Sequence, residues 1–311
     1  MRTVSAQEVS DALAWPALIE RLDACFDGSI ETPLRHHHAI PRDAGEATLL
    51  LMPAWQQAGY IGTKMVNVFP HNAERGLPAI SGVYLLCDGD TGQPLACIEG
   101  SELTRRRTAA ASAVASRYLS REDAETLVMV GTGKLAPMLI EAHAAVRPIS
   151  RVKIWGRHPE KARHLADAYA ERFDCEAVTS LSEAVASADI VSCATLSSEP
   201  LVRGEWLRSG THLDLVGAFR PTMRESDSAC LSRAEVFVDT YEGAKGEAGD
   251  IHQAIEEGDF QFDAIRGELR ELISGASPGR SSPQAVTLFK SVGASLEDLA
   301  AAIEVWEQLE S

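Results

Sequence analysis

The stretch that decides the fold is TLVMVGTGKLAPMLIEAHAAV, Thr126–Val146, near the middle of the 311-residue chain. Four apolar residues run into Gly131-Thr132-Gly133, and an alanine-rich amphipathic segment follows. The pattern predicts a strand that turns into a helix through a G-x-G-x-x-A motif ending at Ala136. Its glycines allow a tight turn and close approach of a pyrophosphate, and the helix N-terminus attracts the phosphates. The motif alone has little specificity, but a second strand follows the helix, as a dinucleotide-binding unit requires.

From Thr126 onward, strands and helices alternate. The expected strands are Thr126–Val130, Arg151–Trp155, Asp189–Thr195, Thr211–Val216 and Glu235–Asp239, with helices over 134–146, 159–173 and 180–188. Such alternation predicts an α/β fold with a doubly wound parallel sheet. We place this Rossmann domain at residues 121–290.

The residues before this domain follow a different pattern. Short apolar runs at 47–55, 60–69, 80–88 and 94–100 are separated by turn-rich segments, which predicts antiparallel strands. Thr108–Leu119 is expected to form a buried helix of small residues. Ser295–Leu309 is expected to form an amphipathic helix in which Ser295 and Asp298 resemble a capping box. We therefore expect a second, α+β domain at residues 1–120, and a C-terminal helix within 291–311 that returns to it.

The composition argues against two broad classes of partner. A net charge of −16 would repel nucleic acid, and the only dense basic run is Arg105-Arg106-Arg107. No apolar run approaches the roughly 18 residues of a membrane helix, and the first twenty residues lack the apolar core of a signal peptide. The six cysteines form no C-x-x-C pair. We expect a soluble cytoplasmic protein that acts on a small molecule.

The residues after the second Rossmann strand indicate which dinucleotide binds. An NAD-binding domain usually has Asp or Glu there to accept hydrogen bonds from the adenosine ribose, whereas this chain has Gly156 and Arg157. A guanidinium suits a 2′-phosphate and offers nothing to a free 2′-hydroxyl. The alternative is an ordinary solvated helix start, in which Glu160 offsets one charge. We predict NADPH in preference to NADH.

Three cationic residues of the first domain are candidates for binding a substrate carboxylate. Lys64 lies within an apolar strand, Arg107 opens the small-residue helix, and Arg35 follows a turn-like segment. A cation at a helix N-terminus opposes the macrodipole, so Arg107 is expected to need an anionic partner. A substrate carboxylate would supply one, and an internal salt bridge to an Asp or Glu is the alternative.

The three consecutive histidines His36–His38 are not expected to bind a metal ion. Adjacent residues of an extended segment point to alternate faces, and no cysteine or carboxylate accompanies them at a metal-site spacing. We predict no metal site, and we place these histidines at the mouth of a pocket beside Arg35.

Several longer motifs resemble the ornithine cyclodeaminase/μ-crystallin family. They include TKMVNVF (63–69), RRRTAAASAVASRYL (105–119), THLDLVGAFRPTMRES (211–226) and VTLFKSVG (286–293), and they run in order from about Arg35 to the final helix. The resemblance implies a Rossmann domain inserted into a substrate domain, whose strands pair with a second subunit to form a homodimer. It implies that Arg35, Lys64 and Arg107 bind the substrate carboxylate, with Lys64 also serving in proton transfer. The cofactor-contacting positions that it implies are Thr108, Gly131, Thr132, Gly133, Arg157, Thr195, Val216, Gly217, Lys290 and Ser291.

One departure separates the activities of this family. True cyclodeaminases carry an Asp shortly after the Val-Gly pair that ends the fifth Rossmann strand, whereas this chain has Ala218 and Phe219. A phenyl ring can neither accept a proton nor pair with an ammonium group. The resulting hypothesis is an NADPH-dependent reductase of cyclic ketimine acids. It would convert Δ1-pyrroline-2-carboxylate to L-proline, or Δ1-piperideine-2-carboxylate to L-pipecolate, by hydride transfer to C2. The alternatives are ornithine cyclodeaminase, an alanine dehydrogenase-like enzyme, and a non-catalytic NADPH-binding protein.

Overall fold

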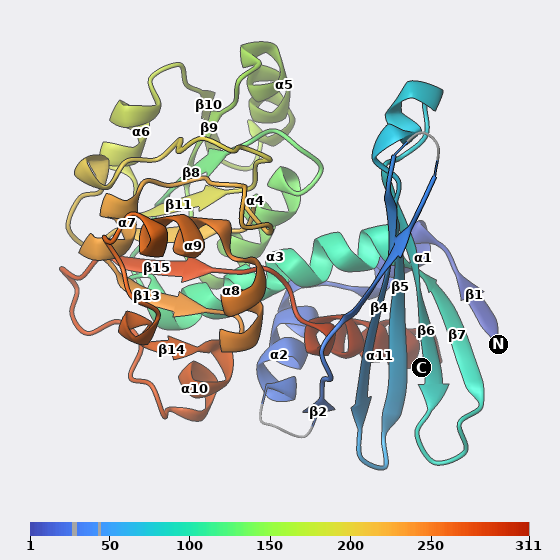
Figure 1. Cartoon of the computed structure of the whole chain (residues 1–311). Coiled ribbons are helices and arrows are strands. Elements are labelled where there is room, and N and C mark those ends of the chain that lie inside the picture. The colour runs from blue at the N-terminus through green and yellow to red at the C-terminus, as the bar shows by residue number, and fades with distance from the viewer. Residues whose placement is uncertain (27–29, 43–44, 311) are drawn as a thin grey trace. The chain divides into compact units, whose positions relative to one another are not determined.

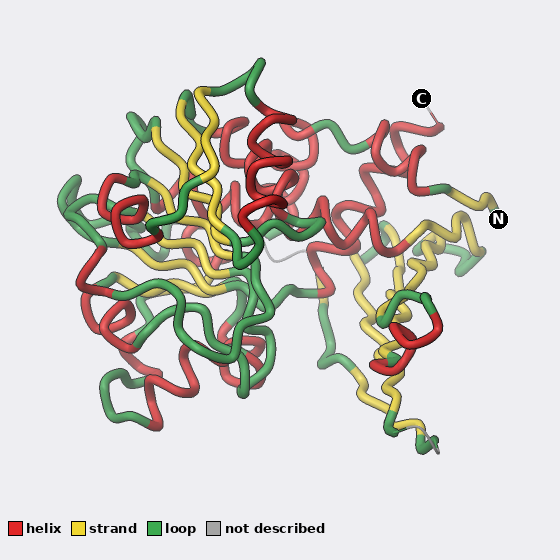
Figure 2. Tube along the Cα trace, turned by 90° about the horizontal axis from the view of Figure 1, so that it is seen from above, coloured by secondary structure: helices red, strands yellow, loops and turns green. Residues whose placement is uncertain are grey.

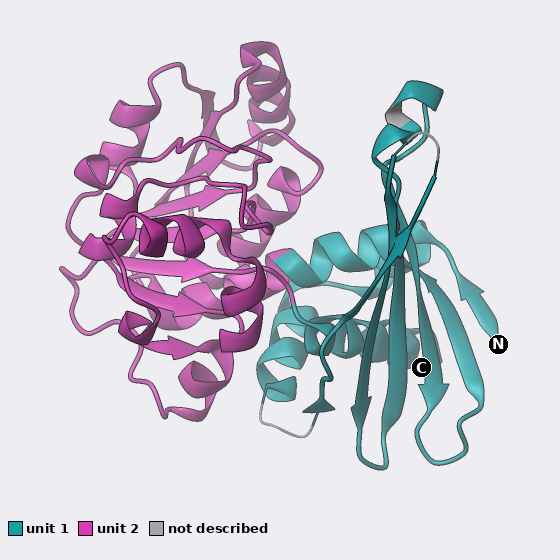
Figure 3. Ribbon diagram, viewed as in Figure 1, with its two compact units in different colours: residues 1–108, 294–311 teal, residues 109–293 magenta. Residues whose placement is uncertain are grey.

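The computed structural model describes residues 1–26, 30–42 and 45–310, and the chain forms two compact units. Unit 1 comprises residues 1–108 and 294–311, and unit 2 comprises residues 109–293 (Figure 3). The division falls inside one continuous helix, α3 (Gly100–Leu119), and not at the boundary near residue 120 that the sequence suggested. A parallel sheet in unit 2 and a second sheet in unit 1 confirm the predicted fold class.

Unit 2 is built on an eight-stranded, all-parallel sheet with the order β10-β9-β8-β11-β12-β15-β13-β14. Its strands are β8 (Thr126–Val130), β9 (Arg151–Trp155), β10 (Asp174–Ala177), β11 (Ile190–Cys193), β12 (His212–Leu215), β13 (Glu235–Val238), β14 (Gly267–Glu268) and β15 (Thr287–Lys290). The five predicted strands are confirmed, and β10, β14 and β15 are additional. The strand order reverses between β8 and β11, and ligands of doubly wound sheets bind at the carboxyl ends of strands at such a point.

Helices cover both faces of this sheet (Figures 1 and 2). They are α4 (Ala136–Val146), α5 (Pro159–Tyr169), α6 (Leu181–Ser187), α7 (Ser228–Arg233), α8 (Tyr241–Glu247), α9 (Gly249–Glu256) and α10 (Leu269–Ser274), together with the 3-10 segments η2 (Gly204–Trp206) and η3 (Phe262–Ala264). Strand β12 shows why both faces are covered. Leu213 and Leu215 join an apolar cluster with residues of α6, α7 and α9. Asp214, on the opposite face, accepts hydrogen bonds from Ser112 of α3 and contacts His143 of α4.

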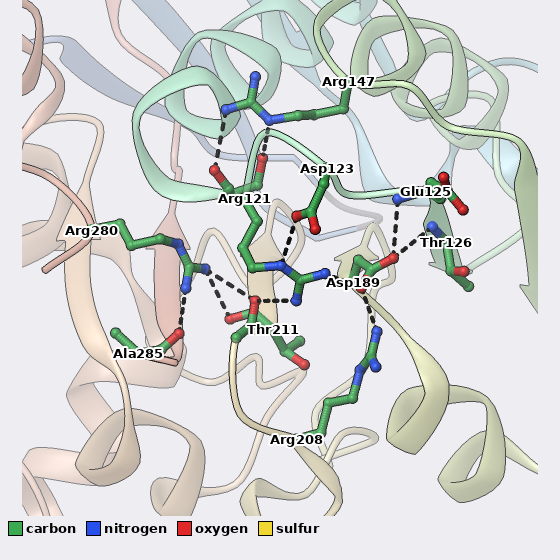
Figure 4. Close-up of polar contacts among 12 residues, drawn as sticks. Arg121, Asp123, Glu125, Thr126, Arg147, Asp189, Arg208, Thr211, Arg280 and Ala285 are labelled. Carbon is green, nitrogen blue, oxygen red and sulfur yellow. Dashed lines mark hydrogen bonds and ion pairs between the residues drawn. The ribbon is translucent and has the colours of Figure 1, made fainter. Parts of the chain in front are cut away.

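Arginine side chains close the amino-terminal edge of the unit 2 sheet (Figure 4). Asp189, just before β11, accepts hydrogen bonds from the amide of Thr126 and from Arg121. Arg147 and Arg280 donate to main-chain carbonyls at the end of α3, which satisfies acceptors that a helix C-terminus leaves without partners. This edge is therefore occupied by internal contacts, whereas ligands of doubly wound sheets bind at the carboxyl edge.

Unit 1 contains a seven-stranded sheet with the order β1-β7-β6-β5-β4-β2, in which β3 also pairs with β4. Its strands are β1 (Arg2–Val4), β2 (Ile30–Glu31), β3 (His36–Ile40), β4 (Ala47–Gln56), β5 (Tyr60–Val68), β6 (Ile80–Asp88) and β7 (Pro94–Glu99). The pairs among β4, β5, β6 and β7 are antiparallel, which confirms the prediction for these four runs. Only β1 pairs in parallel, with β7, among the described strands of this sheet.

The helices of unit 1 are α1 (Ala6–Ala12), α2 (Trp15–Cys25), the 3-10 segment η1 (Pro70–Arg75), the first part of α3, and α11 (Ser295–Glu310). The C-terminal helix α11 packs against α2 and against strands β4, β5 and β6, and Leu296, Leu299 and Ile303 are buried in this contact region. Within the described ranges, no helix combines the length and the apolar character that a membrane crossing needs.

Candidate active site

A buried group of opposite charges lies in unit 1, where β5, α3 and α11 meet. Lys64 on β5 places its Nζ 2.8 Å from Oδ1 and 2.7 Å from Oδ2 of Asp298. Arg107 on α3 donates from Nε to the same Oδ1 at 2.8 Å, and from Nη1 to Glu297. Lys64 and Arg107 are only 3% and 5% exposed, and both acids are fully buried. Two of the three predicted substrate-binding cations thus share one carboxylate.

The structure corrects the reasoning that singled out Arg107. Helix α3 begins at Gly100, so Arg107 lies in its second turn and not at its N-terminus. The argument from the helix dipole is therefore wrong for this residue. Its anionic partners are Glu297 and Asp298, which is the internal salt bridge that the sequence left open. Asp298, which the sequence suggested as part of a capping box, directs its carboxylate at Lys64 and Arg107.

Neighbouring charges and burial set the protonation of this group. Burial lowers the pKa of Lys64 to about 8, and the charges of Arg107 and Arg35 act in the same direction, while Asp298 opposes them. Burial alone would raise the pKa of the Asp298 carboxyl, but Arg107 and Lys64 hold it below its usual value. Arg35, half-buried just before β3, is therefore close enough to act on Lys64.

Three residues that sequence reasoning missed belong to this region: Glu297, Asp298 and Tyr84. Tyr84 lies directly opposite Lys64 in the β5–β6 register, and its buried hydroxyl has no hydrogen-bond partner among the described residues. Its ring packs on Gly62, where a Cβ atom would lie 2.0 Å from the hydroxyl oxygen. The available signal for the two acids was their position in the first turn of the helix, just before the apolar run Leu299–Ile303.

The phosphate loop of unit 2 has the geometry that a dinucleotide needs. Gly131 adopts a φ of +120°, and a Cβ atom there would lie 2.6 Å from the carbonyl oxygen of Ala194. A Cβ atom on Gly133 would meet nothing within 4 Å, so a ligand can approach the backbone at this point. Helix α4, which follows, has no side-chain cap at its N-terminus, and its first residue, Ala136, is fully buried. These residues fit a bound pyrophosphate.

Arg157 is the second residue after β9 and is exposed. It forms no ion pair with any residue in the ranges that the structure describes, whereas Glu160 contacts His158 at 3.5 Å. The guanidinium of Arg157 is thus accessible to a ligand. Gly156, before it, packs against the phosphate loop, because a Cβ atom there would lie 2.7 Å from Cγ2 of Thr132.

Other predicted cofactor positions follow the carboxyl ends of β11, β12 and β15. Thr195 donates its amide and its hydroxyl to Glu225. The ammonium group of Lys290 is fully buried, donates to the carbonyl of Gly217, and lies 3.2 Å from Oδ2 of Asp250. These polar groups are engaged inside the protein, so a direct contact between them and a cofactor stays a prediction.

The remaining predicted positions are placed as follows. Val216 and Ser291 are buried, and Ser291 donates to Asp239 at 3.3 Å. Thr108 is half-buried on α3. His36–His38 form most of β3 and are exposed, and the described part of the chain contains no group of three or more His, Cys, Asp or Glu suited to a metal ion.

A phosphate loop on a doubly wound parallel sheet defines this chain as a dinucleotide-binding protein of the Rossmann class. Within that class, the chain belongs to the ornithine cyclodeaminase/mu-crystallin family, whose model matches residues 2–311. The resemblance seen in the sequence motifs is thereby confirmed.

Two curated relatives illustrate the range of similarity. Protein SAR DEFICIENT 4 of Arabidopsis thaliana is 42% identical over 90% of this chain and 87% of its own length. Delta(1)-pyrroline-2-carboxylate reductase of Colwellia psychrerythraea is 36% identical over 99% of both chains.

Solved structures agree with these relatives. The Delta(1)-pyrroline-2-carboxylate reductase of Thermococcus litoralis, in complex with NADH and L-proline, has a TM-score of 0.93 and 33% identity, and the match covers 100% of this chain and 98% of that one. An archaeal alanine dehydrogenase dimer with bound NAD has a TM-score of 0.90 and 28% identity over 100% of this chain and 96% of that chain.

Proposed function

We propose that this chain reduces the C=N bond of cyclic ketimine acids with NADPH. The substrates are Δ1-pyrroline-2-carboxylate, which gives L-proline, and its six-membered homologue, which gives L-pipecolate. The chain is an oxidoreductase that acts on C=N bonds, as the full-length similarity to named reductases indicates. The observation that carries the choice of substrate is the buried charge group of unit 1.

The cations of this group suit a substrate that carries a carboxylate. Lys64 and Arg107 are paired with Asp298 and Glu297, and the charge of Arg35 also acts on Lys64. A guanidinium can bind a carboxylate through two parallel hydrogen bonds.

The same ion pairs make the site compatible with an iminium substrate. Three uncompensated cations would repel a protonated imine, but Lys64 and Arg107 are paired with Asp298 and Glu297. Lys64 is suited to the proton transfer, because a group whose pKa lies near 8 can both release and regain a proton near neutral pH.

The dinucleotide, when bound, supplies the hydride. Gly131, Gly133 and the N-terminus of α4 would hold its pyrophosphate, and Arg157 would bind the 2′-phosphate that distinguishes NADPH from NADH. The guanidinium is exposed and forms no ion pair with the residues that the structure describes, which supports this preference. Because the similar reductase of Thermococcus litoralis was solved with NADH, activity with NADPH should be compared with activity with NADH.

The outer face of the unit 1 sheet supports the homodimer as part of the proposal. Ile61, Met65 and Leu85 are 38%, 39% and 38% exposed, and all three lie on the face opposite Lys64. Exposed apolar groups that cluster on one sheet face are typical of a protein interface.

The deciding experiment follows the loss of NADPH absorbance with Δ1-pyrroline-2-carboxylate and with Δ1-piperideine-2-carboxylate. Parallel reactions contain NADH with each imine, pyruvate with ammonia and NADPH, and ornithine with NAD+. Rapid NADPH loss with a cyclic imine, faster than with NADH, is the expected result. Ammonia release from ornithine would instead make the chain a cyclodeaminase. If only the reaction of pyruvate with ammonia proceeds, the chain is alanine dehydrogenase-like.

A further inference from the structure

A second buried charge group lies in unit 2, below the carboxyl ends of three adjacent strands. Strands β11, β12 and β15 are neighbours in the sheet. Glu225, Asp250 and Lys290, all fully buried, lie next to the loops that follow these strands. The proposed chemistry uses neither of the two acids.

Glu225 holds the loop after β11. Its Oε1 accepts a hydrogen bond from the amide of Thr195 at 2.6 Å and another from the Thr195 hydroxyl at 2.8 Å. The loop after β12 passes close by at Gly217, where a Cβ atom would lie 2.4 Å from Oε1 of Glu225 and 2.2 Å from the Thr195 carbonyl oxygen. The two loops and the carboxyl group fit together only because residue 217 has no side chain.

Asp250 and Lys290 hold the same region from the other side. Oδ1 of Asp250 accepts from the amides of Glu225 and Ser226, each at 2.8 Å. Lys290 donates to the carbonyl of Gly217 and pairs with Asp250. Beyond Gly217, Ala218 adopts a φ of +48°, a strained conformation for a residue with a side chain, which such contacts must maintain.

The charges of this group do not balance when both acids are ionised. Lys290 supplies one positive charge against two carboxylates, and Oε2 of Glu225 has no hydrogen-bond partner among the described residues. Burial raises the pKa of Glu225 to about 7, which Asp250 also favours and Lys290 opposes. Cys193 on β11 also faces Glu225, and burial raises the pKa of its thiol well above the usual value, so it stays neutral. A proton on Oε2 makes the group neutral and leaves Oε1 free to accept both bonds from Thr195.

We propose that Glu225 is a positioning residue, which holds Thr195 and the Gly217 loop in the arrangement that receives the dinucleotide. This inference rests on the proposed reductase function. Its physical consequence is a cofactor affinity that depends on pH. Ionisation of Glu225 adds a buried negative charge at the edge of the sheet that receives an anionic ligand, so NADPH should bind more weakly above pH 7.

The test compares wild type with Glu225→Gln and Glu225→Ala by fluorescence titration of NADPH between pH 5.5 and 9. The glutamine amide has the shape of the protonated acid, so E225Q should bind NADPH with the wild-type Kd at pH 6 and show no weakening above pH 7. E225A loses both bonds to Thr195 and should raise the Kd roughly tenfold or more at every pH.

Glu257→Gln is the matched control. Glu257 is exposed and pairs with Arg224, the neighbour of Glu225, so E257Q disturbs the same loop without touching Thr195. It should lower thermal stability and leave the pH dependence of the NADPH Kd unchanged.

Two results would overturn the proposal: a pH dependence in E225Q equal to that of wild type, or a wild-type Kd in E225A. If E225A does not fold, as judged by circular dichroism, the comparison of E225Q with wild type decides alone. Repeating the titration with NADH separates this inference from the cofactor preference. The two proposals can fail separately. If the NADPH Kd of E225Q does not change with pH but the wild-type protein reduces no imine, the reductase proposal is refuted and the positioning role of Glu225 stands.

Discussion

At the scale of the residue, protonation of one lysine connects the structure with activity. Lys64 is buried against Asp298, and burial together with the charges of Arg107 and Arg35 lowers its pKa to about 8. Between pH 8 and the ordinary lysine pKa of 10.5, the folded protein therefore binds fewer protons than the unfolded chain. Burying the charged amine costs stability below pH 8, and this cost is relieved as the pH rises through that interval.

The first prediction concerns Lys64→Met. If the protonated amine serves the reaction, kcat/KM for the imine is constant below pH 8 and falls above it in wild type. The variant should lose roughly ten- to a hundredfold in kcat/KM and lack this basic limb, because a hydrogen bond to a charged group is removed. Steady-state rates between pH 6 and 10 measure both effects. The imine ionises identically in both reactions, so a basic limb that persists unchanged in K64M excludes Lys64 as its source.

The second prediction concerns Arg157→Ser. Loss of the guanidinium should raise the KM for NADPH roughly ten- to a hundredfold and leave the KM for NADH nearly unchanged, because only NADPH carries the 2′-phosphate. Arg163→Ser is the control, since Arg163 is also exposed and lies further along α5. Equal KM changes for the two dinucleotides in R157S would show that Arg157 does not read the 2′-phosphate.

At the scale of the element, the loops after the parallel strands depend on close approach of main chains. Gly217 and Gly246 are both in unit 2, but they differ in their surroundings. A Cβ atom at 217 would lie 2.2 Å from the Thr195 carbonyl oxygen, whereas one at 246 would meet nothing within 4 Å.

The third prediction uses this difference. Gly217→Ala should lower the thermal midpoint, because forcing a methyl group into a filled space costs about 1–3 kcal/mol. It should also weaken NADPH binding by displacing Thr195. Gly246→Ala, in helix α8, should raise the midpoint slightly, because alanine is favoured over glycine in a helix by about 0.5–1 kcal/mol. Thermal denaturation followed by circular dichroism compares the two, and a G217A midpoint at or above wild type would contradict the packing described at Gly217.

At the scale of the whole molecule, the two faces of the unit 1 sheet have different roles. One face carries Lys64 and Tyr84 and is buried in part by α11. The other face leaves Ile61, Met65 and Leu85 exposed.

The fourth prediction is that this outer face forms the dimer. Met65→Glu combined with Leu85→Glu should convert a dimer into a monomer, because like charges would then meet in an apolar contact. Size-exclusion chromatography with light scattering measures the mass. Ile255→Glu is the control, since Ile255 on α9 of unit 2 is also 38% exposed. A double variant that remains dimeric places the interface elsewhere.

Much of unit 2 could be predicted because its signals are local. The apolar run of β8 and the glycines after it specify strand, turn and helix within one short segment. Strands β10, β14 and β15 were missed for different reasons. β10 carries two acids among its four residues, β14 has only two residues, and β15 follows a polar, turn-rich segment instead of a helix. Pairing with neighbouring strands stabilises all three. The start of α3 was also missed. Its charged first turns look like a loop, but Arg105 and Arg106 pair with Glu102 on the same helix.

By itself, the sequence determined the fold class and the phosphate loop, and it singled out Arg35, Lys64 and Arg107 as candidate substrate-binding cations, since each depends on residue types and spacing along the chain. Only the tertiary structure decided which acids neutralise those cations. Lys64 and Asp298 are 234 positions apart, and Arg107 and Glu297 are 190 positions apart. The same holds for Thr195 and Glu225. No periodic pattern encodes such distances, because they arise when separate strands and helices pack together, and packing brings into contact residues that the order of the chain keeps apart.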